Sequence, residues 1–179
     1  MNPILNLIEE ISQRNLWDKT VELKRNEYLK VQGSIDTNLY LVVEGSLKIF
    51  VVDNFEEQII RFGYTNNLIA ALDSFIHEQP SDFYIQALRK TILKRIPKKS
   101  FMDLIFSSPA HLKIWHSILE SFVLQQMERE RDILTTSPVE RYRRVLKRSP
   151  QLFQEIPNKY IASYLRMTPE TLSRIKKSF

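Results

Sequence analysis

The spacing of apolar residues changes twice along the chain. Over residues 2–12 the apolar positions Ile4, Leu7, Ile8 and Ile11 recur at helical spacing, which predicts a short helix. From residue 20 onward the chain contains short runs rich in β-branched and aromatic residues, separated by turn residues. These runs predict strands over residues 21–23, 28–31, 39–43, 47–52, 58–62, 83–87 and 91–96. So many short strands predict an antiparallel sandwich or barrel.

Helical spacing returns after residue 96. We expect a short helix over residues 98–106 and a long one from Pro109 to about Leu134. One stripe of the long helix is apolar, which allows it to cover its own sheet, to face a second subunit, or both. We favour a homodimer because the helix is long for so small a domain. The stripe that we assign to dimerisation consists of Leu112, Trp115, Leu119, Phe122 and Val123.

Residues 137–140 have the pattern of a helix start. Ser137 can accept a hydrogen bond from the amide of Glu140, and Pro138 suits the first helical position because it has no amide hydrogen to leave unpaired. We therefore expect a helix to about Lys147, and a domain boundary just before it. The predicted domains are residues 1–136, a β-domain with its flanking helices, and residues 137–179.

Residues 156–177, IPNKYIASYLRMTPETLSRIKK, show the sparse apolar pattern of two short helices that cross steeply. Ala162 is the small residue at the crossing, and Thr168 and Pro169 begin the second helix as N-cap and first helical residue. The turn needs one residue that favours positive φ, and Arg166 occupies it at a cost of about 1 kcal/mol. The residues expected to face inward are Ile161, Leu165, Met167, Leu172 and Ile175.

This pattern predicts a helix-turn-helix that binds double-stranded DNA. Glu170, Ser173 and Arg174 would face the major groove and read bases, since arginine can pair with a guanine edge and glutamate can accept from cytosine. The phosphate-contacting candidates are Lys159, Arg166, Thr168, Lys176 and Lys177. The alternative is a helical hairpin with ordinary surface charges.

The distribution of charge supports the DNA-binding interpretation. The chain carries a net charge of +5, and residues 129–179 alone hold 12 Lys and Arg against 5 Asp and Glu. A positive end suits a polyanion partner, although a solvated basic tail would have the same composition. The chain contains no cysteine, no apolar run long enough for a membrane span and no secretory pattern at its start. We expect a cytoplasmic protein with no membrane partner.

Four stretches resemble the Crp/Fnr family of transcription regulators: LYLVVEGSLKIF, IIRFGYTNNLIAALDSFIHEQPSDFYIQAL, SPVERYRRVL and TPETLSRIKK. The resemblance covers nearly the whole chain. It implies an α+β protein with an antiparallel β-roll (a cupin-like double-stranded β-helix) as sensor domain, a long dimerisation helix and a C-terminal helix-turn-helix domain. It also implies double-stranded DNA as partner, a homodimer, and RNA polymerase as a further candidate partner.

The resemblance bears on the ligand of the sensor domain. Family members that bind a cyclic nucleotide hold the ribose with a glycine-glutamate pair and the phosphate with an arginine-serine pair. Here these pairs align with Ala70-Ala71 and Ser81-Asp82, so the ribose acceptor and the phosphate cation are missing and a carboxylate is added. We expect that cyclic AMP does not bind in the usual way. The sensor-pocket candidates are Leu68, Ala70, Ala71, Leu72, Ser81 and Asp82, and the effector is an unidentified small molecule or none.

Two other function classes fit the sequence less well. A cupin-type metalloenzyme needs clustered histidines, but His77, His111 and His116 form no His-x-His pair. We therefore expect no metal, no cofactor and no enzymatic activity. The second alternative is a ligand-sensing or protein-interaction module without specific DNA binding.

Overall fold

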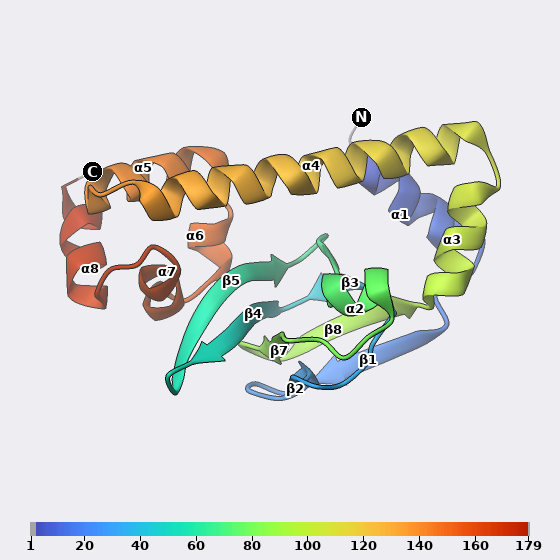
Figure 1. The fold of residues 1–179 in the computed structure, drawn as a ribbon, viewed down its shortest axis with the longest axis horizontal. Helices are drawn as coiled ribbons and strands as arrows, with labels where there is room; N and C mark the ends of the chain where they lie inside the picture. The colour runs from blue at the N-terminus through green and yellow to red at the C-terminus, as the bar shows by residue number, and fades with distance from the viewer. Residues whose placement is uncertain (1–2, 179) are drawn as a thin grey trace.

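The computed structural model describes residues 3–178, which fold into two antiparallel β-sheets and a set of helices around them (Figure 1). One sheet has the strand order β1-β8-β3-β6 and the other β2-β7-β4-β5. The described strands are β1 (Lys19–Leu23), β2 (Tyr28–Lys30), β3 (Leu39–Glu44), β4 (Ser46–Asp53), β5 (Glu56–Tyr64), β6 (Leu68–Ile69), β7 (Tyr84–Ala87) and β8 (Thr91–Ile96). The predicted α+β class with antiparallel sheets is confirmed.

The two sheets bury one apolar cluster between them. Val42, Leu47, Ala87 and Leu93 are inaccessible to solvent and come from strands of both sheets. Tight turns join the strands, and Gly45 connects β3 to β4 with φ +96°. A Cβ atom at Gly45 would lie 2.5 Å from the backbone oxygen of Lys90, so glycine is required for both conformation and space.

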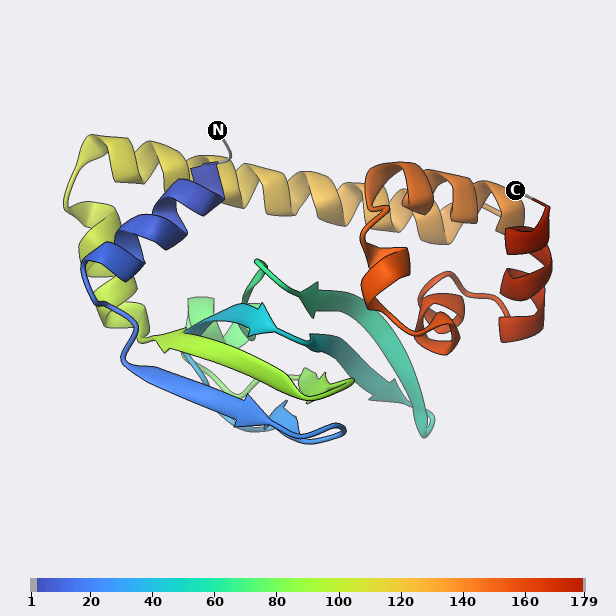
Figure 2. The same ribbon diagram turned by 180° about the vertical axis from the view of Figure 1, so that it is seen from behind.

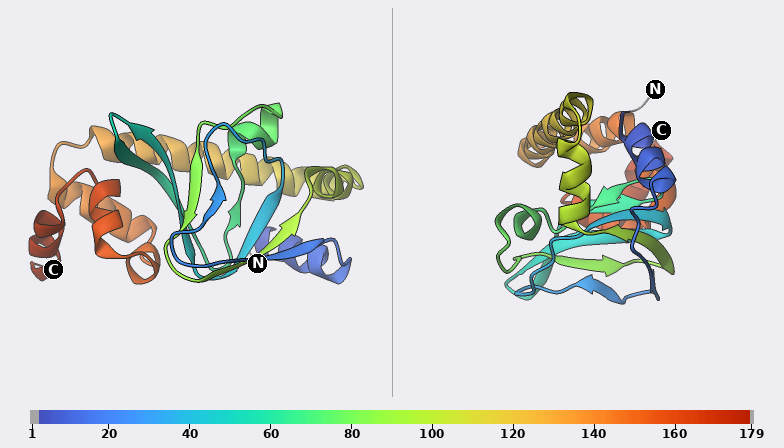
Figure 3. Two further views of the ribbon diagram at one scale, coloured as in Figure 1. Left: turned by 90° about the horizontal axis from the view of Figure 1, so that it is seen from below. Right: turned by 90° about the vertical axis from the view of Figure 1, so that its right-hand side faces the viewer.

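The helices flank the sheets, and the longest runs the length of the molecule (Figures 1 and 2). Helices α1 and α3 pack at one end of the molecule, and α5 to α8 gather at the other (Figure 3). Within the described part of the chain, none of these helices is both long and apolar enough to span a membrane. Their bounds are α1 (Pro3–Gln13), α2 (Leu72–His77), α3 (Lys98–Phe106), α4 (Pro109–Leu134), α5 (Pro138–Arg148), α6 (Leu152–Glu155), α7 (Asn158–Tyr164) and α8 (Pro169–Lys177).

Three of these elements were not expected from the pattern. Strand β6 has two residues, α6 has four, and α2 has six and begins at Leu72, after an N-cap residue, Ala71, that makes no side-chain hydrogen bond. None is long enough to show a period, so apolar spacing could not reveal them. The long helix α4 and the helix α3 have the bounds that the sequence predicted.

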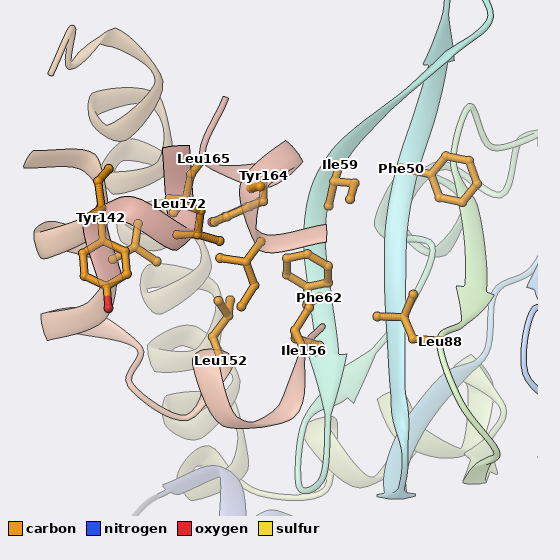
Figure 4. Packing of buried hydrophobic residues seen from close by; sticks show 14 residues of the cluster. Phe50, Ile59, Phe62, Leu88, Tyr142, Leu152, Ile156, Tyr164, Leu165 and Leu172 are labelled. Carbon is orange, nitrogen blue, oxygen red and sulfur yellow. The ribbon is translucent and has the colours of Figure 1, made fainter. Parts of the chain in front are cut away.

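The helices α5 to α8, which we call the head, share a core with the β-sheet beside them. Phe62 of β5 packs against Tyr164 of α7, with ring centroids 5.4 Å apart, and Ile59 joins the same cluster (Figure 4). The division of the chain into residues 1–136 and 137–179 stays a prediction, and the head lies docked on β5 in this structure.

Candidate nucleic-acid interface and β-roll loop

The turn between α7 and α8 is a well-formed helix C-cap. Arg166 has φ +55°, as the sequence predicted for this position. The backbone N–H of Met167 donates to the oxygen of Ala162 at 3.0 Å, and that of Arg166 donates to Ser163 at 3.0 Å. This is the double hydrogen bond of the Schellman motif, in which the left-handed residue is usually glycine. Arg166 therefore leaves the geometry of the turn intact.

A buried arginine on α5 holds this turn in place. The Arg141 guanidinium donates to the backbone oxygens of Leu165 at 2.8 Å and Arg166 at 3.1 Å. It also donates to the oxygens of Thr135 at 2.6 Å and Thr136 at 3.1 Å. One side chain thus ties the α7–α8 turn to the link between α4 and α5. Sequence reasoning missed this role, because Arg141 looked like one more basic residue of the tail.

Helix α8, the second helix of the pair, has one buried face and one exposed face. Leu172 and Ile175 are buried, as are Ile161, Ala162 and Leu165 of the first helix and turn. Met167, also expected inside, is half-buried. Thr168 accepts a hydrogen bond from the N–H of Thr171 at 3.2 Å, which confirms it as the N-cap. Helix α8 lies at the end of the molecule, on the side of the head away from the sheets (Figure 1).

The three residues assigned to base reading lie together on the open face of α8. Glu170, Ser173 and Arg174 are all exposed. The hydrogen bond from the backbone N–H of Glu170 to its own carboxylate, and a further bond from Thr168, lower the pKa of Glu170. Its side chain is therefore a carboxylate at neutral pH and acts only as a hydrogen-bond acceptor. An exposed helix face with one carboxylate and one guanidinium has the chemistry to favour specific base pairs.

The phosphate-contacting candidates differ in their surroundings. Lys159, Arg166 and Lys177 are exposed, and the Lys159 ammonium lies 4.6 Å from the centre of the Tyr160 ring. Lys176 is half-buried, and its ammonium donates to Asn158 Oδ1 at 3.0 Å. The structure thus leaves three of these cations open to solvent, while Lys176 already has a partner.

Much of the positive charge at this end of the chain is used inside the protein. Arg144 and Arg148 pair with Asp132 of α4, at 2.9 and 2.5 Å. Arg129 is also buried, as is Arg141. The net charge of residues 129–179 therefore overstates the charge that is available to a polyanion.

The apolar side chains of the α4 stripe point in two directions, some into the protein and some into solvent. Trp115 and Phe122 pack into the apolar cluster between α4, α1 and α3, whereas Leu112 is 41% exposed and Val123 60% exposed. Leu119 is half-buried. Four further large apolar residues of α4 that the sequence assignment omitted are exposed, namely Leu124, Met127, Ile133 and Leu134. The side of α4 that faces away from the sheets is uncovered in Figures 1 and 2.

The loop between α2 and β7 is organised around one carboxylate. Asp73 Oδ1 accepts from the Ser81 hydroxyl at 2.8 Å, and Oδ2 accepts from the backbone N–H of Asp82 at 3.0 Å. Lys30 is buried nearby, and this burial lowers its pKa while Asp36 and Asp73 raise it. The donors of the loop are therefore already bound to a carboxylate of the protein itself.

The three histidines do not form a cluster. Among the residues that the structure describes, there is no group of three or more metal-ligating side chains. His77 and His116 are exposed. His111 is buried, and its Nε2 lies 2.7 Å from a Glu10 oxygen, which joins α4 to α1.

Comparison with known proteins agrees with this geometry. The family model of the cyclic nucleotide-binding domain matches residues 20–108. No curated protein matches the chain.

Solved structures share the fold beyond this domain. FixK2 from Bradyrhizobium japonicum has a TM-score of 0.72 at 15% identity, and the match covers 89% of this chain and 83% of that one. The catabolite activator protein of Thermus thermophilus has a TM-score of 0.60 at 20% identity, covering 98% and 85%. The c-di-GMP responsive global regulator CLP of Xanthomonas campestris has a TM-score of 0.66 at 14% identity, covering 97% and 90%. At these identities the likeness shows the fold.

Within the matched residues 20–108, the six sensor-pocket candidates do not line one cavity. Leu68, Ala70 and Leu72 line a space of about 40 Å³ beneath α4, little more than the volume of one water molecule. Ala71 and Ser81 are buried, and Asp82 is exposed. The carboxylate at the loop belongs to Asp73, a residue that the sequence alignment did not single out.

Proposed function

We propose that the chain is a homodimeric, DNA-binding transcription regulator of the Crp/Fnr type, in which α7 and α8 form the helix-turn-helix. The observation that carries the proposal is the open face of α8, where Glu170, Ser173 and Arg174 are exposed while Leu172 and Ile175 anchor the opposite face. A helix with this division can enter the major groove without unfolding its own core. The solved regulators with the same fold support it.

In this proposal the uncovered side of α4 forms the dimer. Leu112, Leu119, Val123, Met127 and Leu134 follow one another at steps of four or seven residues, which places them on one stripe of the helix. Two such helices packed side by side would shield these residues from water. A two-fold dimer would present its α8 helices to successive major grooves about 34 Å apart, and would select a roughly palindromic site. RNA polymerase is a further proposed partner.

In the same proposal the β-roll does not bind cyclic AMP in the usual way, and its effector is an unidentified small molecule or none. The Asp73 carboxylate already accepts the hydrogen bonds of the loop, and a phosphate placed there would meet a like charge. This proposal assigns no metal, cofactor or enzymatic activity to the protein.

The experiment that tests DNA recognition is selection of binding sites from a random duplex library, followed by affinity measurements on variants. We expect a palindromic consensus. R174A should lose discrimination at one position per half-site, whereas K177A should weaken binding to all duplexes alike.

The matched control is K99A, since Lys99 is an exposed lysine on α3, far from the head. It should bind like the wild type. A protein-interaction module, the alternative function, would yield no enriched sequence. Equal loss on every duplex for R174A would refute the base-reading role of this residue.

A further inference from the structure

A cavity of about 550 Å³ lies where three parts of the molecule meet. Its walls include Arg61 and Tyr64 of β5, Phe122 and Arg129 of α4, and Tyr164 of α7. Arg61 and Phe122 also border the small space beneath α4, but Arg129 and Tyr164 do not. The cavity therefore opens toward the head, away from the loop that holds Asp73.

Two guanidinium groups of this cavity have no carboxylate partner within the described chain. Arg129 is only 7% exposed, and the one hydrogen bond of its guanidinium is a long one of 3.4 Å to the oxygen of Ile59. Arg61 is half-buried and makes no ion pair or hydrogen bond through its guanidinium among residues 3–178. Burial lowers the pKa of both arginines. A desolvated cation without a counter-ion is unfavourable, so an anion would be stabilised here.

Both guanidinium groups stack on the faces of aromatic rings. The Arg129 guanidinium carbon lies 3.6 Å from the centre of the Tyr164 ring, and that of Arg61 lies 5.2 Å from the centre of the Phe122 ring. Stacking of this kind leaves the N–H edge of a guanidinium free, and that edge matches a carboxylate or phosphate with two parallel hydrogen bonds.

The rest of the lining suits an organic anion better than an inorganic one. The described lining contains no acidic side chain, while apolar and aromatic residues alternate with carboxamides such as Asn67 and Gln126. The volume lies in the range of sites for small molecules. The geometry points to a binding site for a small organic anion, with a carboxylate or phosphate held by Arg61 and Arg129 and an apolar body against Phe122 and Tyr164.

The position of the cavity gives such a ligand a regulatory effect. Tyr164 belongs to α7, so a ligand that contacts Tyr164 and Arg129 together favours the arrangement in which the head is docked on β5. Any effect of the ligand on DNA affinity rests on the proposed function, whereas binding of the ligand to the cavity does not depend on it.

The test is calorimetric titration of the full chain, without DNA, with naphthoate, naphthyl phosphate and the neutral naphthamide. We expect at least one anion to bind, and naphthamide to bind roughly tenfold or more weakly, since hydrogen bonds to a charged group are lost. Binding of naphthoate identifies a carboxylate ligand class, and binding of naphthyl phosphate alone identifies a phosphate class.

The variants R129M and R61M should each weaken anion binding by roughly tenfold. R131M is the matched control, because Arg131 is an exposed arginine two residues along the same helix, and it should bind as the wild type does. If R129M is unstable, R61M carries the test. The proposed site would be refuted if naphthamide bound as tightly as the anions, if R129M and R61M both kept wild-type affinity, or if neither anion bound. None of these results would affect the proposal of DNA recognition.

Discussion

The attachment of the head to α4 depends on Asp132. Its carboxylate is fully buried and pairs with Arg144 at 2.9 Å and Arg148 at 2.5 Å. Both arginines come from α5, and both also approach Glu128, at 2.7 and 3.6 Å. The network therefore connects the last turns of the long helix to the first helix of the head. Replacing Asp132 with asparagine keeps the volume and removes the charge.

The magnitude follows from burial. Removing one partner of a buried ion pair costs about 3–5 kcal/mol, because the other charge remains desolvated. The side chains of Arg144 and Arg148 are 18% and 27% exposed and keep Glu128, so the cost should lie near or below the lower limit. We predict that D132N lowers the free energy of unfolding by about 2–3 kcal/mol, which corresponds to a fall in Tm of roughly 5–10 °C for a chain of this size.

Unfolding in guanidinium chloride measures this loss, provided that the m-value is unchanged. D103N is the control, since Asp103 makes an exposed ion pair with Lys99 on α3 and should contribute under about 1 kcal/mol. If D132N and D103N lose the same stability, the network does not hold the head to the long helix. A double-mutant cycle between D132N and R148M would then show no coupling.

Other predictions concern the turn between β3 and β4, the stability of the protein at acidic pH, and the binding of cyclic AMP. G45A should destabilise the fold by about 2–4 kcal/mol, because φ is +96° and the added Cβ would overlap backbone, whereas G33A should cost less since its Cβ meets nothing within 4 Å. The Arg95 guanidinium lowers the pKa of Asp18, so this pair stabilises the protein above the unfolded pKa near 3.8 and the contribution disappears as pH falls. D18N should flatten that part of the stability–pH curve by under about 1 kcal/mol, as measured by denaturation from pH 2 to 6. Cyclic AMP at micromolar concentration should give no saturable heat in calorimetry, and saturable binding would contradict the role given to Asp73.

Local signals in the sequence predicted a large part of the structure. Helix starts at Pro138 and Pro169 were predicted from N-cap residues followed by proline, and the start at Pro109 from the proline itself, because a helix start is decided within one turn of backbone. The left-handed residue at Arg166 came from the spacing of the two helices around it. These features depend only on neighbours in the chain.

Features that depend on distant partners were not predicted. Apolar spacing identified the stripe of α4 but not the direction in which each side chain points, so Trp115 and Phe122 were grouped with residues that face away from the sheets. The roles of Arg141 and Asp132 were missed because each depends on groups in another helix. The loop carboxylate of Asp73 was missed for the same reason: its donors lie eight and nine residues away, across a bend.

The most direct test of the account is the affinity of the protein for a selected duplex, measured by fluorescence anisotropy as the salt concentration rises. With at least two phosphates neutralised in each half-site, a dimer should show a log–log slope of about −4 or steeper. R174A should bind the selected duplex more weakly with a slope that stays close to that of the wild type. A slope near zero, or equal affinity for the selected and a scrambled duplex, would contradict the claim that α8 reads DNA.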